Sequence, residues 1–158
     1  MSEEAKNETP FYDPDPITMP VLALRGLVVY PKMMVHFDVG REASVKAVEE
    51  AMSTNSPVFL VAQKDIRVEE PEKKDLFSAG TIAQVRQILR LPGKTVRVMV
   101  EGQRRAVLRT MTQTEPYLEG KIVPVEEEKV HIEGKPNSLR AEAVIRRAYE
   151  LFDRYTEL

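Results

Sequence analysis

Residues 81–101 read TIAQVRQILRLPGKTVRVMVE, and this stretch decides the fold. Two extended runs are separated by residues 91–94, in which Pro92 and Gly93 occupy the second and third positions of a type II turn. After the turn, valine recurs at positions 96, 98 and 100, which is the two-residue period of a strand with one buried face. The stretch therefore predicts an antiparallel hairpin.

Further strands are expected on both sides of this hairpin. The segment 58–62 is apolar throughout, which is typical of a strand buried on both faces. Gly102 is expected to turn the chain out of the hairpin and into another strand. Other extended runs are expected at residues 19–24, 33–39, 104–112 and 117–125.

One helix is expected among these strands, over residues 42–54. Val45, Val48 and Met52 recur at helical spacing and predict its buried face, and Pro57 prevents the helix from continuing. The fold class that follows is α+β and mainly β. We expect a small β-barrel or sandwich with one crossover helix, followed by a C-terminal helix.

The chain divides into four expected parts. Residues 1–16 are acidic and rich in proline, as in a disordered tail, and residues 17–125 form the β-rich domain. Residues 126–137 are expected to be a linker, and residues 138–158 a helix without a stop signal. We therefore expect the chain to be an N-terminal fragment of a longer protein.

The composition excludes several classes of protein. The 158 residues are 42% hydrophobic and 30% charged, as in globular proteins, and the absence of cysteine excludes disulfides and cysteine zinc sites. A net charge of −2 argues against a dedicated polyanion binder. The sequence contains neither a secretory signal nor an apolar run long enough to span a membrane, so we expect a cytoplasmic protein.

Motifs for chemistry are weak in this sequence. Gly93, Lys94 and Thr95 resemble the end of a phosphate-binding loop, but the required glycine is missing at position 88 and a strand follows instead of a helix. His36 and His131 lie in separate segments without further ligands at metal-binding spacing. We therefore expect neither a metal site nor a catalytic residue in this chain.

A basic strip covers residues 81–110, where seven Lys and Arg residues face a single acid, Glu101. Such a strip is compatible with nucleic-acid binding, but it contains no aromatic residue on which a base could stack. It also fits the solvated face of an antiparallel sheet, where charges prevent unwanted pairing.

Residues 28–34, with the sequence VVYPKMM, are the least regular apolar segment. Part of the segment should pack in the core, but a loop containing proline cannot bury all of its side chains. Exposed methionine and aromatic side chains form adaptable contact surfaces. This segment is therefore the candidate for a hydrophobic binding patch.

Six short motifs follow one another along the β-rich part of the chain. They are PVLALRGLVVYP at 20–31, VGRE at 39–42, VAQK at 61–64, GTIA at 80–83, LPGKT at 91–95 and VEGQRRA at 100–106. In these motifs and their order, residues 18–125 resemble the N-terminal domain of the Lon family of ATP-dependent proteases. Ala23, Gly26 and Tyr30 depart from the residues that the family usually has at these positions.

The resemblance implies a PUA-like β fold, with a helical connector starting at Ser138. It implies that an ATPase module, which holds ATP and Mg, and a Ser–Lys peptidase module lie outside this chain, which itself holds no cofactor. The implied role is non-catalytic recognition of unfolded, damaged or degron-bearing proteins (clients) and help in assembling a hexamer. Two alternatives stay open, namely a nucleic-acid-binding PUA-like domain and a stand-alone regulator that binds a small molecule or a peptide.

Residues for these roles can be named. The expected client-binding patch consists of Val29, Tyr30, Pro31, Met33 and Met34. An alternative client site is the strand containing Arg97, Val98 and Met99, which could pair with an extended peptide at a sheet edge. For self-association, the expected surface is a stripe on the last helix, which could also fold back on the β-rich part; its central members are Ile145, Ala148 and Phe152.

Overall fold

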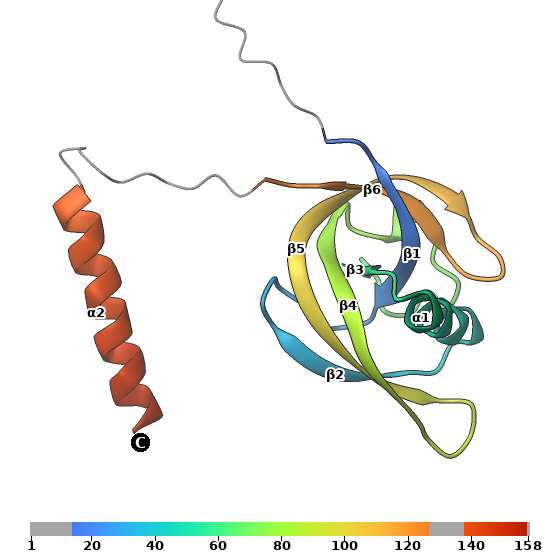
Figure 1. Cartoon of the computed structure of the whole chain (residues 1–158), viewed down its shortest axis with the longest axis horizontal. Coiled ribbons are helices and arrows are strands. Elements are labelled where there is room, and N and C mark those ends of the chain that lie inside the picture. The colour runs from blue at the N-terminus through green and yellow to red at the C-terminus, as the bar shows by residue number, and fades with distance from the viewer. Residues whose placement is uncertain (1–13, 127–137, 158) are drawn as a thin grey trace, which may run out of the picture. The chain divides into compact units, whose positions relative to one another are not determined.

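The computed structural model describes residues 14–126 and 138–157, which form two units, and each unit is described by itself. The second unit is the helix α2 (Ser138–Thr156). The acidic tail and the linker expected from the sequence fall almost wholly outside the described residues, as does His131. The first unit contains the elements β1 (Ile17–Leu24), β2 (Met34–Val39), α1 (Glu42–Thr54), β3 (Val58–Ala62), η1 (Lys73–Asp75), β4 (Ala79–Arg90), β5 (Val96–Gln113) and β6 (Glu119–Pro124) (Figure 1).

The strands form one sheet in the order β2-β5-β4-β3-β1-β6, and β6 also pairs with β5. This additional pairing closes β1, β3, β4, β5 and β6 into a ring, while β2 pairs with the first part of β5. β1 and β3 are parallel, so the chain must cross over between them, which it does through β2 and α1. The expected mainly β fold with one crossover helix is confirmed.

The hairpin predicted from residues 81–101 joins β4 to β5, with Arg90 opposite Val96. Gly93 has a φ of 87°, the left-handed conformation that the third position of a type II turn requires. The prediction that Gly102 ends this hairpin is wrong. Gly102 lies inside β5, which continues to Gln113, and a register shift against β4 falls beside it.

Two buried clusters lie on opposite faces of β1 and β3. Along β3, Phe59 and Val61 belong to one cluster, while Val58 and Leu60 belong to the other. The Phe59 cluster draws on every strand of the ring, and the Leu60 cluster includes Val48 of α1. The prediction that β3 is buried on both faces is therefore confirmed, because its side chains alternate between two cores.

The buried face of α1 differs slightly from the predicted one. Val48 is buried as expected, together with Ala47 and Ala51, but Met52 is exposed. Alanine side chains are short, so they let the helix approach the sheet closely, and α1 packs mainly against β1 and β4. The helix ends at the predicted place, where Asn55 adopts a left-handed conformation two residues before Pro57.

Candidate functional site

The loop between β1 and β2 contains the predicted patch, but Val29 is not part of its exposed surface. Only 3% of Val29 is exposed, because its side chain belongs to the core cluster that α1 covers. Its carbonyl oxygen accepts a buried hydrogen bond from Thr81 Oγ1 at 2.6 Å. Val29 therefore anchors the loop. The prediction that its side chain belongs to a client-binding surface is wrong.

The neighbours of Val29 face solvent. The exposed fractions are 51% for Tyr30, 38% for Met33 and 58% for Met34. Val28 is also exposed, which follows from the alternation of an extended segment whose middle residue is buried. The sequence analysis missed Val28, although the same alternation with Val29 could have indicated it. We define the apolar patch as the exposed Val28, Tyr30, Met33 and Met34 together with the half-buried Pro31.

Gly102 of β5 holds the apolar patch in place. The Lys32 N–H donates to the Gly102 carbonyl, and the Gly102 N–H donates to the Met33 carbonyl, both at 2.8 Å. A Cβ atom on Gly102 would lie 2.2 Å from the Tyr30 carbonyl oxygen, so only glycine permits this close approach. The turn also places Lys32 at a φ of 66°. The patch is thus fixed to a central strand of the barrel.

A cation lies beside the aromatic ring of the patch. The Arg105 guanidinium carbon is 5.7 Å from the centroid of the Tyr30 ring, within the range of a cation–π interaction. The two methionine side chains next to it are unbranched and can change rotamer to follow different partners. The patch therefore offers apolar contact with a positive charge at one margin.

The alternative client site on β5 is wrong. Arg97, Val98 and Met99 pair with β2 on one side and with β4 on the other. Their backbone N–H and C=O groups are therefore already used in the sheet, and no peptide can add to this strand. Arg97 is exposed, but its side chain binds Asp38, and Met99 is half-buried opposite His36.

Several arginines of the basic strip are held by acids. Arg97 Nε donates to Asp38 Oδ1 at 2.8 Å, and its Nη2 donates to Oδ2 at 3.2 Å. This bidentate pair lowers the pKa of Asp38 and raises the pKa of Arg97, in both cases mainly through the hydrogen bonds between their side chains. Two further ion pairs, each to a single carboxylate oxygen, join Arg86 to Glu101 at 2.6 Å and Arg90 to Glu49 at 2.8 Å. These pairs fit the solvated face of a sheet better than a nucleic-acid surface.

Neither metal-binding clusters nor membrane-spanning helices occur in residues 14–126 and 138–157. Within them, no group of three or more His, Cys, Asp or Glu side chains could hold a metal ion. No helix in the same residues is long and apolar enough to cross a membrane. His36 is exposed on β2.

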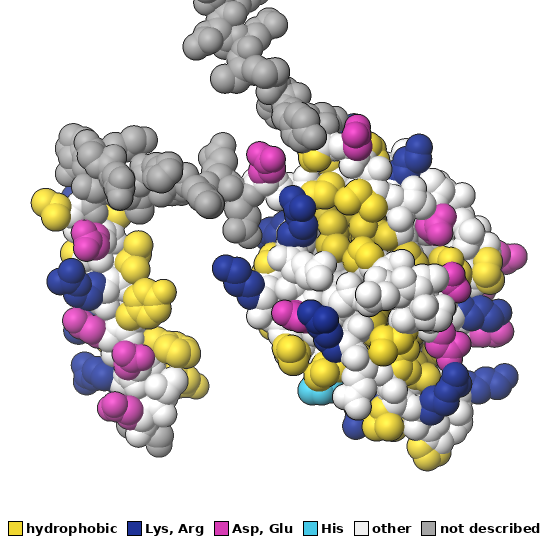
Figure 2. Space-filling view, in the orientation of Figure 1, with side chains coloured by type: hydrophobic (Ala, Val, Ile, Leu, Met, Phe, Trp, Pro, Cys, Tyr) yellow, Lys and Arg dark blue, Asp and Glu magenta, His cyan; other side chains and the backbone are white. Residues whose placement is uncertain are grey.

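The second unit, α2, has an amphipathic surface. Hydrophobic side chains gather along one side of the helix and charged ones along the other (Figure 2). The predicted residues Ile145, Ala148 and Phe152 are all exposed, and their spacing puts them on one face. Ion pairs between Arg146 and Glu142 and between Arg147 and Glu150 stabilise the charged surface.

Comparison with known proteins shows the family of the chain. Residues 18–158 match the family model of the ATP-dependent protease La (LON) substrate-binding domain. The Lon protease of Clostridium acetobutylicum is 47% identical over 110 residues, which cover 70% of this chain and 14% of that protein. Lon protease 1 of Bacillus subtilis is 38% identical over 141 residues, which cover 89% of this chain and 17% of that protein. The chain therefore spans less than a fifth of the length of these relatives.

Solved structures show the same fold. The N-terminal domain of the Mycobacterium avium complex Lon protease superimposes with a TM-score of 0.56 at 24% identity, over 90% of this chain and 76% of that one. The Lon N-terminal domain protein from Xanthomonas campestris gives a TM-score of 0.59 at 15% identity, over 85% of this chain and 75% of that one. At these identities the likeness extends to the fold alone.

Proposed function

This chain belongs to the family of Lon substrate-binding domains, and from that membership we propose that its β-rich unit binds unfolded, damaged or degron-bearing proteins through the apolar patch. The patch needs no cofactor for this role. The catalytic steps belong to other parts of a longer protein, an ATP-dependent Ser–Lys endopeptidase whose ATPase part uses ATP and Mg. This chain covers only a small part of the length of each relative, which supports placing the catalytic steps elsewhere.

The exposure of Tyr30, Met33 and Met34 on a rigid support is the observation that carries the proposal. Unfolded proteins expose apolar segments that folded proteins bury, so an apolar surface can select them. Methionine side chains adapt to different partners, which gives contact with little sequence selectivity. A single patch of this size binds weakly, and several copies in one assembly would raise the overall affinity.

The test is a double substitution, Tyr30→Asp with Met33→Asp. Binding of a dye-labelled, reduced and alkylated α-lactalbumin is measured by fluorescence anisotropy. We expect the affinity to fall about tenfold, because roughly 1.4 kcal/mol of apolar burial is lost and a charge is placed in the contact.

The matched control is Ile66→Asp with Leu89→Asp, which changes two exposed apolar side chains outside the patch. This control adds the same negative charge and should leave the affinity unchanged. Circular dichroism verifies that both variants fold. Equal affinity of the folded patch variant and the unaltered protein would refute the role of the patch.

For the second unit, we propose that α2 contributes to self-association, as in a hexamer, through Ile145, Ala148 and Phe152. The exposure of an apolar stripe on a helix with a charged opposite face favours this role. Sedimentation velocity of Ile145→Glu with Phe152→Glu should show smaller species than the unaltered chain at the same concentration. Leu139→Glu, off the stripe on the same helix, is the control. An unchanged sedimentation coefficient for the stripe variant would contradict the proposal.

A further inference from the structure

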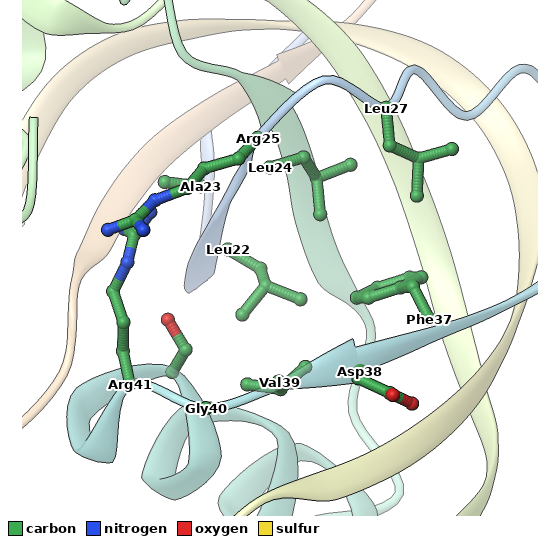
Figure 3. A pocket seen from close by; sticks show the side chains of 11 residues that line it. Leu22, Ala23, Leu24, Arg25, Leu27, Phe37, Asp38, Val39, Gly40 and Arg41 are labelled. Atoms are coloured by element: carbon green, nitrogen blue, oxygen red, sulfur yellow. The ribbon is translucent and has the colours of Figure 1, made fainter. Parts of the chain in front are cut away.

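A pocket of about 310 Å³ lies where β1 and β2 end and α1 begins, apart from the apolar patch (Figure 3). Its accessible apolar walls are the half-buried Ala23, Leu27 and Phe37, above a buried floor that includes Leu22. Arg25 and Arg41 also line it. Figure 3 shows their guanidinium groups coming together at one end, while Leu27 and Phe37 lie at the other end.

A buried amide positions Arg41. The Arg41 guanidinium donates to Oε1 of Gln63, a residue that is only 4% exposed. The Gln63 Nε2 group donates to the carbonyl oxygens of Asp65 and Val68 at 3.1 and 2.9 Å, so the orientation of the amide is fixed. The guanidinium is therefore held at the pocket by a side chain with no freedom to turn.

Neither arginine has an acidic partner among the residues that the structure describes. Burial, and to a smaller extent the nearby charge of Arg25, lowers the pKa of Arg41. Asp38 lines the same pocket, but its carboxylate is bound by Arg97 and points away from both arginines in Figure 3. Glu42 is paired with Lys46 at 3.1 Å. Within residues 14–126, no ion pair involves Arg25 or Arg41.

The first turn of α1 adds to the positive field. Arg41 is the N-cap residue and its side chain makes no capping hydrogen bond to the helix. The first helical N–H groups therefore point outward without a side-chain acceptor, and they carry the positive end of the helix dipole. The half-buried Ser44 lines the pocket on the same turn. Arg25, the positioned Arg41, the start of α1 and the apolar walls thus meet at one small space.

We propose that this pocket binds the C-terminal residue of a client polypeptide, with its carboxylate on Arg25 and Arg41 and an apolar side chain against Leu27 and Phe37. The C-terminal residue carries both groups on one Cα atom, and the pocket presents guanidinium groups at one end and apolar walls at the other. Paired guanidinium groups are the ordinary partners of a carboxylate. The inference rests on the proposed function, since it adds a chain end to the features by which clients are selected.

Short dye-labelled peptides test the inference by fluorescence anisotropy with the whole chain. One peptide ends in leucine with a free carboxylate, a second has the same sequence with a C-terminal amide, and a third carries an internal aspartate and a C-terminal amide. We expect the free carboxylate to bind at least tenfold more tightly than the amide, and the advantage to shrink as salt is added. Equal affinity for free acid and amide, or tight binding of the internal aspartate peptide, would overturn the inference.

Arg25→Gln is the informative variant, because the Arg25 side chain makes no hydrogen bond or ion pair in the described residues. It should remove the tenfold preference for the free carboxylate, whereas Arg104→Gln, another exposed arginine, should retain it. A retained preference in folded Arg25→Gln would also overturn the inference. The apolar patch is tested separately with Tyr30→Asp and Met33→Asp, which should not alter the preference for the free acid.

Discussion

β3 and the segment 28–34 are both strongly apolar, but only one of them is buried. β3 pairs with β1 on one side and β4 on the other, and its two faces contribute to two different cores. The segment 28–34 connects two strands, and its attachment to Gly102 covers only one side of it. The difference shows that apolar composition does not decide burial, because burial also needs cover on both faces and partners for the backbone.

The largest expected effect comes from removing a large side chain from β3. Phe59→Ala should lower the free energy of unfolding by about 3–5 kcal/mol, because Phe59 is fully buried. Tyr30→Ala should lower it by about 1 kcal/mol or less, since half of Tyr30 is already in water. Urea denaturation of both variants measures the contrast. Similar losses of unfolding free energy in the two variants would contradict the difference in burial between β3 and the segment 28–34.

A methyl group on Gly102 should separate the patch from the barrel. Gly102→Ala is expected to lower the free energy of unfolding by about 3 kcal/mol, since its Cβ atom would collide with the Tyr30 carbonyl. Amide hydrogen exchange at Lys32 should become faster, because its N–H donates to the Gly102 carbonyl. Gly40→Ala is the control, as its Cβ atom would meet its nearest neighbour at an ordinary 3.7 Å. Unchanged exchange at Lys32 would contradict the attachment.

The hydrogen bond from Thr81 of β4 to the Val29 carbonyl anchors the patch segment, and it can be removed by substitution. Thr81→Val leaves the buried Val29 carbonyl without its donor, and we expect a loss of about 1–2 kcal/mol in the free energy of unfolding. Thr81→Ser keeps the hydroxyl and should lose less. Urea denaturation compares the two. A valine variant as stable as the serine variant would show that this hydrogen bond does not anchor the loop.

The smallest effect is expected at the exposed pair that joins β2 to β5. The pKa of Asp38 is lowered in the folded protein, so the pair contributes stability above the unfolded pKa of about 3.9 and loses it as the pH falls through the folded pKa. Arg97→Gln should raise the pKa of Asp38 towards its ordinary value, as measured by NMR titration of the carboxyl group. An unchanged pKa would mean that the pair does not persist in solution.

The sequence predicts elements with a regular local pattern better than contacts between distant segments. The hairpin of β4 and β5 follows from its alternation and from Pro92 and Gly93, and the burial of β3 follows from its uninterrupted apolar run. The prediction of a turn at Gly102 is wrong because a glycine can mark either a turn or a place in a strand that another segment approaches closely. The segment that approaches it lies 70 positions earlier, at Lys32, and no local pattern indicates that contact.

The candidate sites were predicted only in part. Methionine and tyrosine in an irregular segment indicated the apolar patch, but Val29 packs in a core cluster formed by residues far away in the sequence. The pocket of Arg25 and Arg41 was not predicted at all. Each arginine is ordinary where it occurs in the sequence, and only the crossover between β1 and β3 brings them together.

The pairing of β6 with both β1 and β5 determines when the ring can close during synthesis. Ile17 lies opposite Ile122, so the first strand lacks a permanent partner on that side until the last one leaves the ribosome. Pairing between such distant positions is slow, and incomplete sheets expose apolar edges that aggregate. Strand edges of the domain therefore stay unpaired until almost its whole length has been synthesised.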